Sequence, residues 1–203
     1  HDLHNTLAAI LGQVELQKFR VREPAAREGL ALLETAALDG AQTVQRLLQF
    51  ARQRGTIPLE AVDLADVVRE VAEITRPRWQ DEPQRQGLTI RLALELPDLP
   101  RIVANPPELR EVVTNLIFNA VDAMPHGGTL TLAASIGTET VTLTVRDTGI
   151  GMPPEIQARV FEPFFTTKGV RGTGLGLASV YGILERFGGG VAVASALGQG
   201  TTF

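Results

Sequence analysis

The sequence predicts an α-helical hairpin over residues 1–54, followed by an α+β sandwich domain with a mixed sheet over residues 63–203. Three observations predict this division. Apolar residues in the first part recur at alternating steps of three and four, whereas those in the second part switch between helical spacing and strict alternation. A short stretch that contains Gly55 and Pro58 separates the two parts. We therefore expect residues 55–62 to form a linker.

Composition indicates an ordinary globular protein. The 203 residues include 44% hydrophobic and 21% charged residues, with a net charge of −4 and no cysteine. This acidic balance gives no support to nucleic-acid binding, and the lack of cysteine excludes disulfides and thiolate metal sites. No apolar run approaches the roughly 20 residues that cross a bilayer. We expect no membrane contact within this fragment and a cytoplasmic location.

Residues 1–54 are expected to form two helices with a break near Pro24. Their apolar residues form a narrow seam of the kind found in coiled coils and four-helix bundles. Two such helices cannot enclose a core, so we expect a homodimer in which two hairpins make a four-helix bundle. The alternative is that both helices pack on the rest of the chain. The seam comprises Leu3, Leu7, Ile10 and Val14, then Leu30, Leu33, Ala37, Gly40, Val44, Leu47 and Ala51.

The residues beyond the linker predict a succession of helices and strands. The strongest pattern is a helix over 106–124, whose apolar residues follow i, i+3, i+4 spacing. Residues 148–173 are rich in glycine and proline and are expected to form a loop. Helices on one face of a mixed sheet would give the sandwich. The other expected elements are a helix from Asp63, its N-cap, to about Arg78, strands over 88–94, 130–134 and 141–145, a helix over 175–187, and strands over 191–194 and around Thr201.

The polar face of the 106–124 helix carries an unusual set of side chains. Glu111, Asn115, Asn119 and Asp122 follow one another at steps of four, four and three, so they lie along one stripe. Amide oxygens suit Mg²⁺, which prefers oxygen ligands and keeps phosphate oxygens or waters as well. The alternative is that the asparagines are exposed and have no function.

Asp147 follows an expected strand and precedes Gly149 and Gly151. An aspartate in this place can accept a hydrogen bond from an exocyclic amine, and the glycines let the backbone approach a flat ligand. An ordinary turn is the alternative reading of the same residues.

A second glycine-rich segment, 171–177, opens the expected helix 175–187. Such a helix start offers backbone N–H groups to phosphate. The segment has neither the lysine of a Walker loop nor the spacing of a dinucleotide fingerprint. Before it lies the segment 161–168, whose phenylalanines would serve as a hydrophobic anchor or as plain core. Lys168 and Arg171 are available to phosphate oxygens.

In chain order these segments resemble the N, G1, F and G2 boxes of histidine kinases, at residues 115–124, 147–152, 161–168 and 172–177. Residues 198–203 resemble the glycine motif near the end of that domain, and His1-Asp2-Leu3-His4-Asn5 resembles the H box, which carries the phosphoacceptor. The chain is therefore similar to the catalytic core of a sensor histidine kinase, whose domain fold is shared with the ATPases of DNA gyrase and heat-shock chaperones.

The resemblance implies roles for the residues of the H box. His1 would be the nucleophile that takes the phosphoryl group, and Asp2 would hold the proton on its other ring nitrogen. Asn5 would serve dephosphorylation of the partner protein. His4 competes as acceptor, but only His1 has the following acid and an asparagine four residues on. His126, beside two glycines, is expected at the surface.

The resemblance also implies that ATP and Mg²⁺ are cofactors. Asp147 would read the adenine amine, and Asn119 would bind the Mg²⁺ that bridges the phosphates, with Asn115 beside it. Gly172, Gly174 and Gly176 would shape the lid around the phosphates. The expected nucleotide-binding set also contains Asp122, Gly149, Gly151, Phe161, Lys168, Arg171, Thr173, Leu175, Leu177 and Thr201.

The phosphoryl group would pass from His1 to an aspartate of a response regulator receiver domain. The related ATPases activate water with a glutamate one turn before the magnesium asparagine, where this chain has Asn115, so hydrolysis should be slow. Glu111, one turn further back, could act as the base instead, so an ATPase is one alternative function. A scaffold that binds nucleotide without transferring phosphate is a second alternative. Because the acceptor histidine normally lies inside its helix, an upstream sensor segment and any membrane anchor are expected outside this fragment.

Overall fold

The computed structural model describes residues 17, 26, 29–36, 39, 58–163, 165–168 and 174–203. The chain divides into two compact units, His1–Thr56 and Ile57–Phe203. In the first unit residues 29–36 are helical, and most of the expected hairpin, with its break near Pro24, lies outside the described residues. Within the part of the chain that the structure describes, no helix has both the length and the apolar character needed to cross a membrane.

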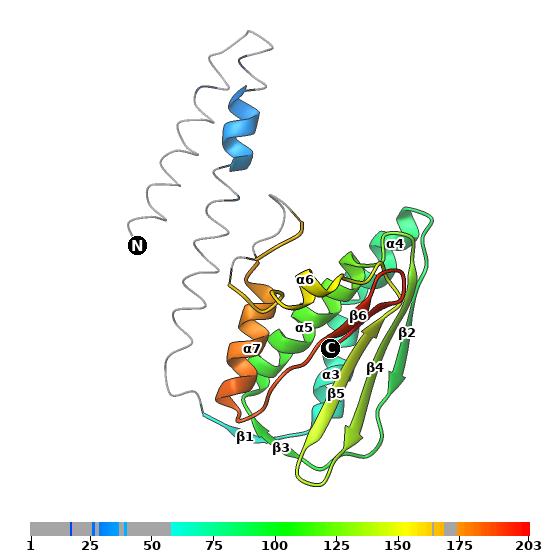
Figure 1. Cartoon of the computed structure of the whole chain (residues 1–203), viewed down its shortest axis with the longest axis vertical. Helices are drawn as coiled ribbons and strands as arrows, with labels where there is room; N and C mark the ends of the chain where they lie inside the picture. The colour runs from blue at the N-terminus through cyan, green and yellow to red at the C-terminus, as the bar shows by residue number, and fades with distance from the viewer. Residues whose placement is uncertain are drawn as a thin grey trace. The chain divides into compact units, whose positions relative to one another are not determined.

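The second unit is built on a five-stranded mixed sheet with the strand order β2-β4-β5-β7-β6 (Figure 1). β2 and β4 run parallel, and every other neighbouring pair is antiparallel. The prediction of a mixed sheet is therefore confirmed. The strands are β2 (Ile90–Glu95), β4 (Gly128–Ile136), β5 (Val141–Asp147), β6 (Ala194–Ala196) and β7 (Gly200–Thr202), and β1 (Glu60–Val62) pairs with β3 (Ile102–Ala104) in a separate two-stranded sheet.

Helices cover one face of this sheet, as the α+β sandwich requires (Figure 1). The three long helices are α3 (Leu64–Ile74), α5 (Pro106–Asp122) and α7 (Gly176–Arg186), with α5 between the other two. Shorter elements follow α3 and β5, namely the π-helical turn η1 (Pro77–Asp81), α4 (Glu82–Arg85) and α6 (Pro154–Gln157).

Side-chain caps fix where α3 and α5 begin. The Asp63 carboxylate accepts a hydrogen bond from the Asp66 N–H at 3.2 Å, which confirms Asp63 as an N-cap. Asn105 does the same for α5, accepting from the Glu108 N–H at 3.1 Å, and prolines occupy the first helical positions. The cap at Asn105 therefore sets the residue at which α5, the helix with the polar stripe, begins.

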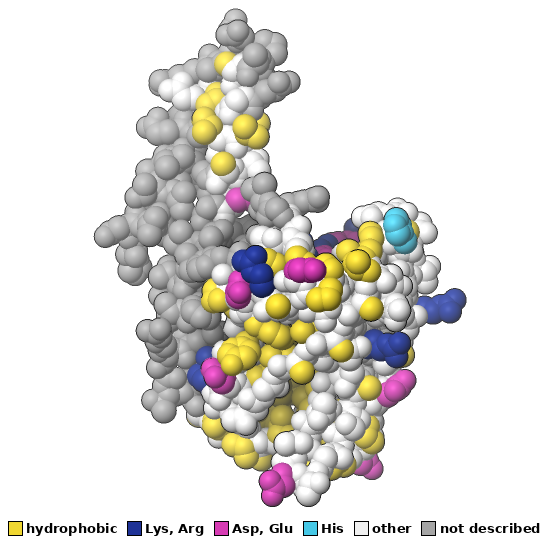
Figure 2. Space-filling view, viewed as in Figure 1, with side chains coloured by type: hydrophobic (Ala, Val, Ile, Leu, Met, Phe, Trp, Pro, Cys, Tyr) yellow, Lys and Arg dark blue, Asp and Glu magenta, His cyan; other side chains and the backbone are white. Residues whose placement is uncertain are grey.

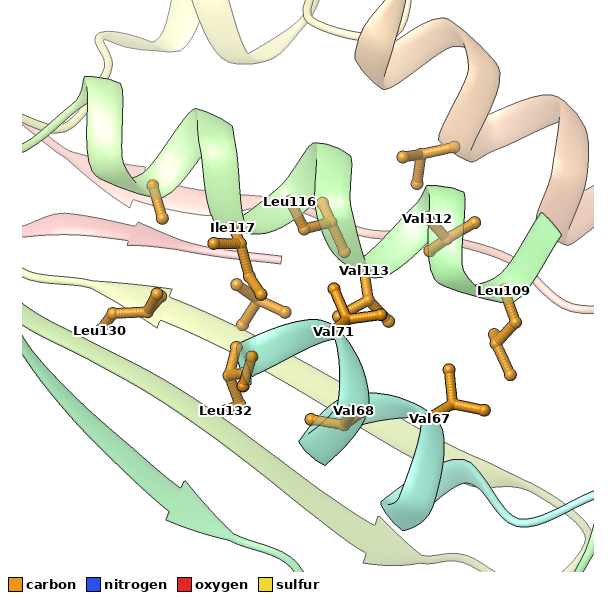
Figure 3. Close-up of a cluster of buried hydrophobic side chains, with 14 of the residues drawn as sticks. Val67, Val68, Val71, Leu109, Val112, Val113, Leu116, Ile117, Leu130 and Leu132 are labelled. Atoms are coloured by element: carbon orange, nitrogen blue, oxygen red, sulfur yellow. The ribbon is translucent and has the colours of Figure 1, made fainter. Parts of the chain in front are cut away.

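The core lies between α3, α5 and the inner face of β4 (Figure 3). Val68, Val113, Ile117, Leu130 and Leu132 are fully buried there. Burial of one such side chain stabilises the fold by about 1.5–3 kcal/mol. The apolar face of α5 that the sequence predicted points into this core, and the opposite face is left for polar side chains.

Several boundaries differ from the expectation, each for a local reason. α3 ends before Arg78 because the Thr75 hydroxyl bonds back to the Val71 carbonyl at 2.7 Å and Pro77 has no N–H to continue the helix. β6 starts at Ala194, where a strand over 191–194 was expected to end, because its partner β7 is only three residues long. β1 falls inside the stretch 55–62 that was expected to be a linker. The short elements β3 and α6 were not foreseen.

Candidate functional site

Asp147 ends β5 with a carboxylate that is 2% exposed. Its Oδ1 accepts two backbone hydrogen bonds, from the Gly149 N–H at 2.8 Å and from the Thr201 N–H at 3.3 Å. Its Oδ2 accepts none from the described residues. Among those residues no side-chain nitrogen or oxygen is both fully buried and without a partner. Oδ2 has no partner, so it is not fully buried, and a ligand can reach it.

The environment of Asp147 shifts its protonation. Burial raises the pKa of this carboxyl above its usual value, because the charged form loses water, and the N–H groups of Gly149 and Thr201 oppose the shift. A hydrogen bond from a ligand amine to the open oxygen would further favour the charged form. A ligand that donates to Oδ2 would therefore supply a hydrogen bond that none of the described residues makes there.

The loop after Asp147 is held against α5 and β4. The Ile150 N–H bonds to the Ala123 carbonyl at 2.9 Å, and the Thr148 hydroxyl accepts from the Thr129 N–H at 2.9 Å. A Cβ at position 149 would collide with the Ala123 carbonyl. Gly149 is therefore required by contact with the protein's own backbone, whereas the sequence suggested contact with a ligand. Gly151 is likewise buried, against the Ala196 carbonyl.

Thr201, expected near the nucleotide, is 4% exposed and is part of a network that the sequence did not reveal. Its hydroxyl lies 3.0 Å from the Ser195 hydroxyl, which donates to the Gly200 carbonyl and accepts from the Met152 N–H. The Gln157 side chain donates to the Ser195 carbonyl at 2.8 Å and to the Met152 carbonyl at 2.9 Å. This network fastens the loop after β5 to the β6–β7 hairpin, and so it positions the Thr201 N–H at Asp147.

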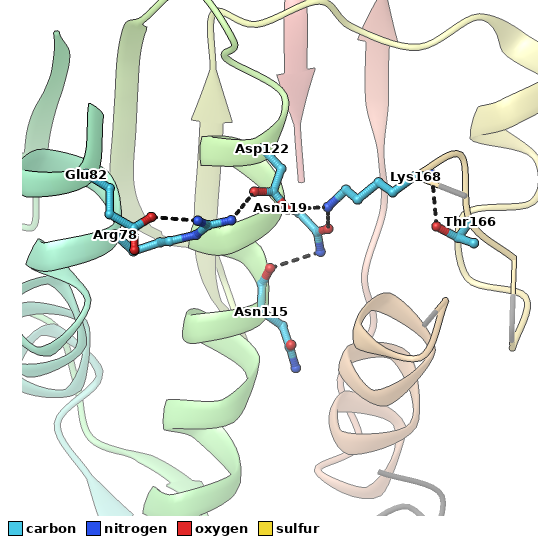
Figure 4. Close-up of polar contacts among 7 residues, drawn as sticks. All are labelled: Arg78, Glu82, Asn115, Asn119, Asp122, Thr166 and Lys168. Atoms are coloured by element: carbon cyan, nitrogen blue, oxygen red, sulfur yellow. Dashed lines mark hydrogen bonds and ion pairs between the residues drawn. The ribbon is translucent and has the colours of Figure 1, made fainter. Parts of the chain in front are cut away.

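The positively charged side chain of Lys168 contacts the polar stripe of α5 (Figure 4). The Lys168 ammonium donates to Asn119 Oδ1 at 3.1 Å and to Asp122 Oδ2 at 2.6 Å. The Asn119 amide nitrogen bonds back to the Asn115 carbonyl at 2.9 Å, which turns its oxygen outward to Lys168. The structure thus brings three of the expected site residues into direct contact, and it places Asn115 one turn away.

The start of α7 packs closely on the same stripe. A Cβ at Gly176 would lie 3.2 Å from Asn115 Oδ1, so only glycine permits this approach without displacement of the amide. Leu175 precedes the helix and is buried, and no side chain caps the first turn. One turn further on, the Ser179 hydroxyl donates to Glu111 Oε1 at 2.6 Å. The first N–H groups of α7 are therefore held beside Asn115 and Asn119.

Phe161 anchors the segment that leads to Lys168. Its ring lies 6.0 Å from that of Tyr181 on α7 and 6.2 Å, edge to face, from that of Phe203. Phe165 takes a different contact, with the Arg159 guanidinium 4.3 Å from its ring centre. Phe161 thus packs against Tyr181 and Phe203, a contact that fits the hydrophobic anchor and the plain core packing equally well.

Comparison with known proteins shows the family of the chain. Residues 104–203 match the family model described as histidine kinase-, DNA gyrase B- and HSP90-like ATPase. The whole chain is similar to sensor kinase CckA of Brucella abortus (strain 2308), at 35% identity over 222 residues, and to sensor histidine kinase ZraS of Salmonella typhi, at 35% over 207 residues. The chain belongs to the sensor histidine kinases.

Solved structures agree with this assignment. The kinase core is similar to full-length ShkA in complex with AMPPNP, with a TM-score of 0.75 and 32% identity over 100% of this chain and 43% of that chain. It is also similar to the mycobacterial sensor histidine kinase MprB, with a TM-score of 0.60 and 29% identity over 71% of this chain and 93% of that chain. The chain spans 22% of the length of CckA and 43% of that of ZraS, so it corresponds to a part of those relatives.

Part of the expected site of this histidine kinase lies outside the described residues. His1, Asp2, His4 and Asn5 do so, as do Arg171, Gly172 and Thr173. Gly174 is described and has a positive φ of 64°, and Leu177 is partly buried against the core. His126 is exposed, as expected. Figure 2 shows where histidine, charged and hydrophobic side chains lie on one face of the molecule.

The structure adds one charged residue that sequence patterns did not single out. Arg78, in η1, donates to Asp122 Oδ1 at 2.7 Å and so shares that carboxylate with Lys168 (Figure 4). In the sequence Arg78 stands at the end of an expected helix, where an exposed arginine is ordinary. Only the fold, which packs η1 against α5, brings it to the site.

Proposed function

We propose that this kinase core binds ATP around Asp147 and Asn119, transfers the γ-phosphoryl group to His1, and passes it on to an aspartate of a response regulator. The observation that carries the proposal is the buried Asp147 carboxylate, which has one oxygen committed to two backbone donors and the other open. An exocyclic amine is the donor that matches such an acceptor, and adenine carries one. The AMPPNP complex of the similar kinase ShkA supports an adenine nucleotide as the ligand.

Asn119 supplies the position for Mg²⁺. Its Oδ1 already accepts from an ammonium ion, and Asp122 adds negative charge beside it, so the residues fit a cation with oxygen ligands. When bound, Mg²⁺ neutralises phosphate oxygens and thereby eases transfer of the phosphoryl group. The chain's own part is to orient the phosphates with Asn119, the Lys168 ammonium and the first turn of α7.

Contacts of Glu111 favour phosphotransfer over hydrolysis. The residue one turn before Asn119 is Asn115, whose amide cannot accept a proton from water. Glu111 is two turns before Asn119, and its Oε1 is engaged by the Ser179 hydroxyl. A water beside the phosphates therefore has an amide, and not a carboxylate, one turn before Asn119, which favours keeping the γ-phosphoryl group for His1.

We assign residues 1–54 the roles of dimerisation and phosphotransfer, residues 55–62 the linker, and residues 63–203 the catalytic ATP-binding role. In a homodimer two hairpins would form a four-helix bundle that displays His1, with Asp2 holding the proton on its second ring nitrogen. A receiver domain docked to accept the phosphoryl group would lie beside Asn5, one turn along the same helix face. Asn5 would then position water for the reverse reaction, dephosphorylation of the receiver.

The test is phosphorylation with γ-labelled ATP. We expect label on the chain that is stable to alkali and labile to acid, as phosphohistidine is, and that His1→Gln abolishes while His4→Gln keeps. Release of free phosphate without labelled protein would indicate an ATPase instead. Labelled His1→Gln protein would show that the acceptor is another residue.

The division of labour in the H box has its own test, with the cognate receiver domain present. Asp2→Asn should reduce phosphorylation of His1 most, and Asn5→Ala should reduce dephosphorylation of the receiver most. Equal losses of both activities in the two variants would contradict the assignment.

A further inference from the structure

Arg78 makes two ion pairs at once. Its Nη1 donates to Glu82 Oε2 at 2.7 Å, and its Nη2 donates to Asp122 Oδ1 at 2.7 Å. The first contact is within its own segment, between η1 and α4, and the second crosses to the end of α5. The hydrogen bond to Glu82 is the largest cause that raises the pKa of the Arg78 guanidinium, so this group is charged at neutral pH.

The segment that carries Arg78 is itself fixed. The neighbouring Trp79 is 9% exposed, and its indole N–H donates to the Ala72 carbonyl at 2.9 Å. The Arg78 N–H bonds to the Thr75 carbonyl at 2.9 Å. π-Helical turns of this kind are frequent at functional sites. The buried Trp79 therefore anchors the backbone beside Arg78, and Glu82 pairs with the guanidinium on the side away from Asp122.

Asp122 lies between two positively charged side chains, Arg78 of η1 and Lys168 of the loop after α6 (Figure 4). Its two oxygens are divided, with Oδ1 on Arg78 and Oδ2 on Lys168. Lys168 is 41% exposed and also reaches Asn119 Oδ1. An anionic ligand at Asn119 would draw the Lys168 ammonium to itself, because Asn119 and Asp122 are three positions apart on one face of α5 and Lys168 already reaches both.

We propose that Arg78 is a positioning residue of the nucleotide site: it neutralises Asp122 so that Lys168 can turn from that carboxylate to the phosphates. Without Arg78, the departure of Lys168 would leave a bare carboxylate one turn from the incoming phosphates, and like charges repel. With Arg78 in place, the Asp122 carboxylate keeps a guanidinium that can donate hydrogen bonds to both of its oxygens, and it stays in the same orientation. This inference rests on the proposed function, since it takes ATP as the ligand.

The experiment is a binding cycle by titration calorimetry, with MgATP and with adenosine, on the whole chain. The variants are Arg78→Met, Asp122→Asn and the two combined. Arg76→Met is the matched control, because Arg76 loses the same charge two residues away but bonds to Gln80 and Glu73 instead of Asp122. A second variant, Arg78→Lys, keeps the charge if the methionine variant fails to fold. Thermal unfolding is recorded for each.

We expect Arg78→Met to weaken MgATP binding about fivefold, the effect of a partly exposed ion pair, and to leave adenosine binding unchanged. Arg76→Met should change neither. In the Asp122→Asn background, Arg78→Met should have no further effect on MgATP, because no carboxylate is left to neutralise. Arg78→Lys should fall between the parent and Arg78→Met.

Three results would overturn the inference. Equal losses from Arg78→Met with and without Asp122 would show a purely structural role, and so would an equal loss for adenosine. Unchanged MgATP binding in Arg78→Met would show that Asp122 needs no partner. If the unsubstituted chain bound neither MgATP nor adenosine, the nucleotide site would be wrong, which overturns the proposed function and this inference together.

Discussion

The Ser179 hydroxyl of α7 donates a hydrogen bond of 2.6 Å to Glu111 Oε1 of α5. This contact lies between two others that join α7 to α5. Gly176 packs on Asn115 before it, and Arg186 pairs with the buried Glu108 after it. α7 is thereby fixed along its length on the helix that carries Asn119.

Replacing Ser179 with alanine should weaken the contact between α5 and α7 and lower the stability of the domain. The Glu111 carboxylate would lose a charge-assisted donor in a partly buried place, at a cost of about 1–3 kcal/mol in the free energy of unfolding. Urea unfolding measures it. Glu111→Gln keeps an oxygen that accepts from Ser179, so its cost should be smaller. A free energy of unfolding like that of the parent for Ser179→Ala would show that the hydrogen bond does not stabilise the contact.

Asp147→Asn should weaken ATP binding. An amide oxygen at this position can still accept from Gly149 and Thr201, so the loop keeps its shape, but the adenine amine would face an NH₂ group or a neutral oxygen. The expected loss is about 1.5–3 kcal/mol, or more than tenfold in the dissociation constant. Asp66→Asn, on the exposed face of α3, serves as the control and should bind normally. Parent-like affinity in both variants would contradict the adenine site.

The same substitution should change how stability depends on pH. Burial raises the folded pKa of Asp147 above its ordinary value of 3.8, so between the two values the folded state binds more protons than the unfolded state. The stabilising effect of the protonated carboxyl is therefore present below pH 3.8 and is lost as pH rises through the folded pKa. Asp147→Asn has no such loss. Its stability relative to the parent should rise across this window and stay constant above it, as denaturant melts at several pH values would record. A difference that shrinks as pH rises would contradict the raised pKa.

Asn119→Ala should make nucleotide binding less dependent on Mg²⁺. The variant removes the amide oxygen that would face the metal, while Asp147 still reads the base. Titration with ATP at increasing Mg²⁺ should therefore give a flatter rise in affinity than the parent shows. Thr114→Ala, on the same helix, is a control away from the contacts of Asn119. A rise as steep as that of the parent would mean that the metal is held elsewhere.

Residues whose neighbours in the sequence determine their place were predicted well. The apolar face of α5 follows from its own spacing, and Asp63 caps α3 through an N–H three residues on. The roles of Asp147, Asn119 and Thr201 in a nucleotide site stay predictions, and the structure adds a hydrogen bond from the Thr201 N–H to Asp147. These are cases in which local chemistry and the fold agree.

Contacts between distant segments were not accessible from patterns. Arg78 reaches Asp122 over a separation of 44 residues, and Gln157 reaches Ser195 over 38. Neither arginine at a helix end nor glutamine in a loop is unusual by itself. β1 and β3 are three residues each, too short for alternation to be read, and their pairing is fixed by the chain on either side.

The Asp147–Thr201 contact also has a temporal side. The two residues are 54 positions apart, so during synthesis β5 is complete before β7 is made. Until then a nascent chain offers the carboxylate only the Gly149 N–H, and the loop lacks its hairpin. If ATP binds at Asp147 as proposed, it would meet the complete acceptor geometry in a chain synthesised past Thr201, and would stabilise the late steps of vectorial folding more than the early ones.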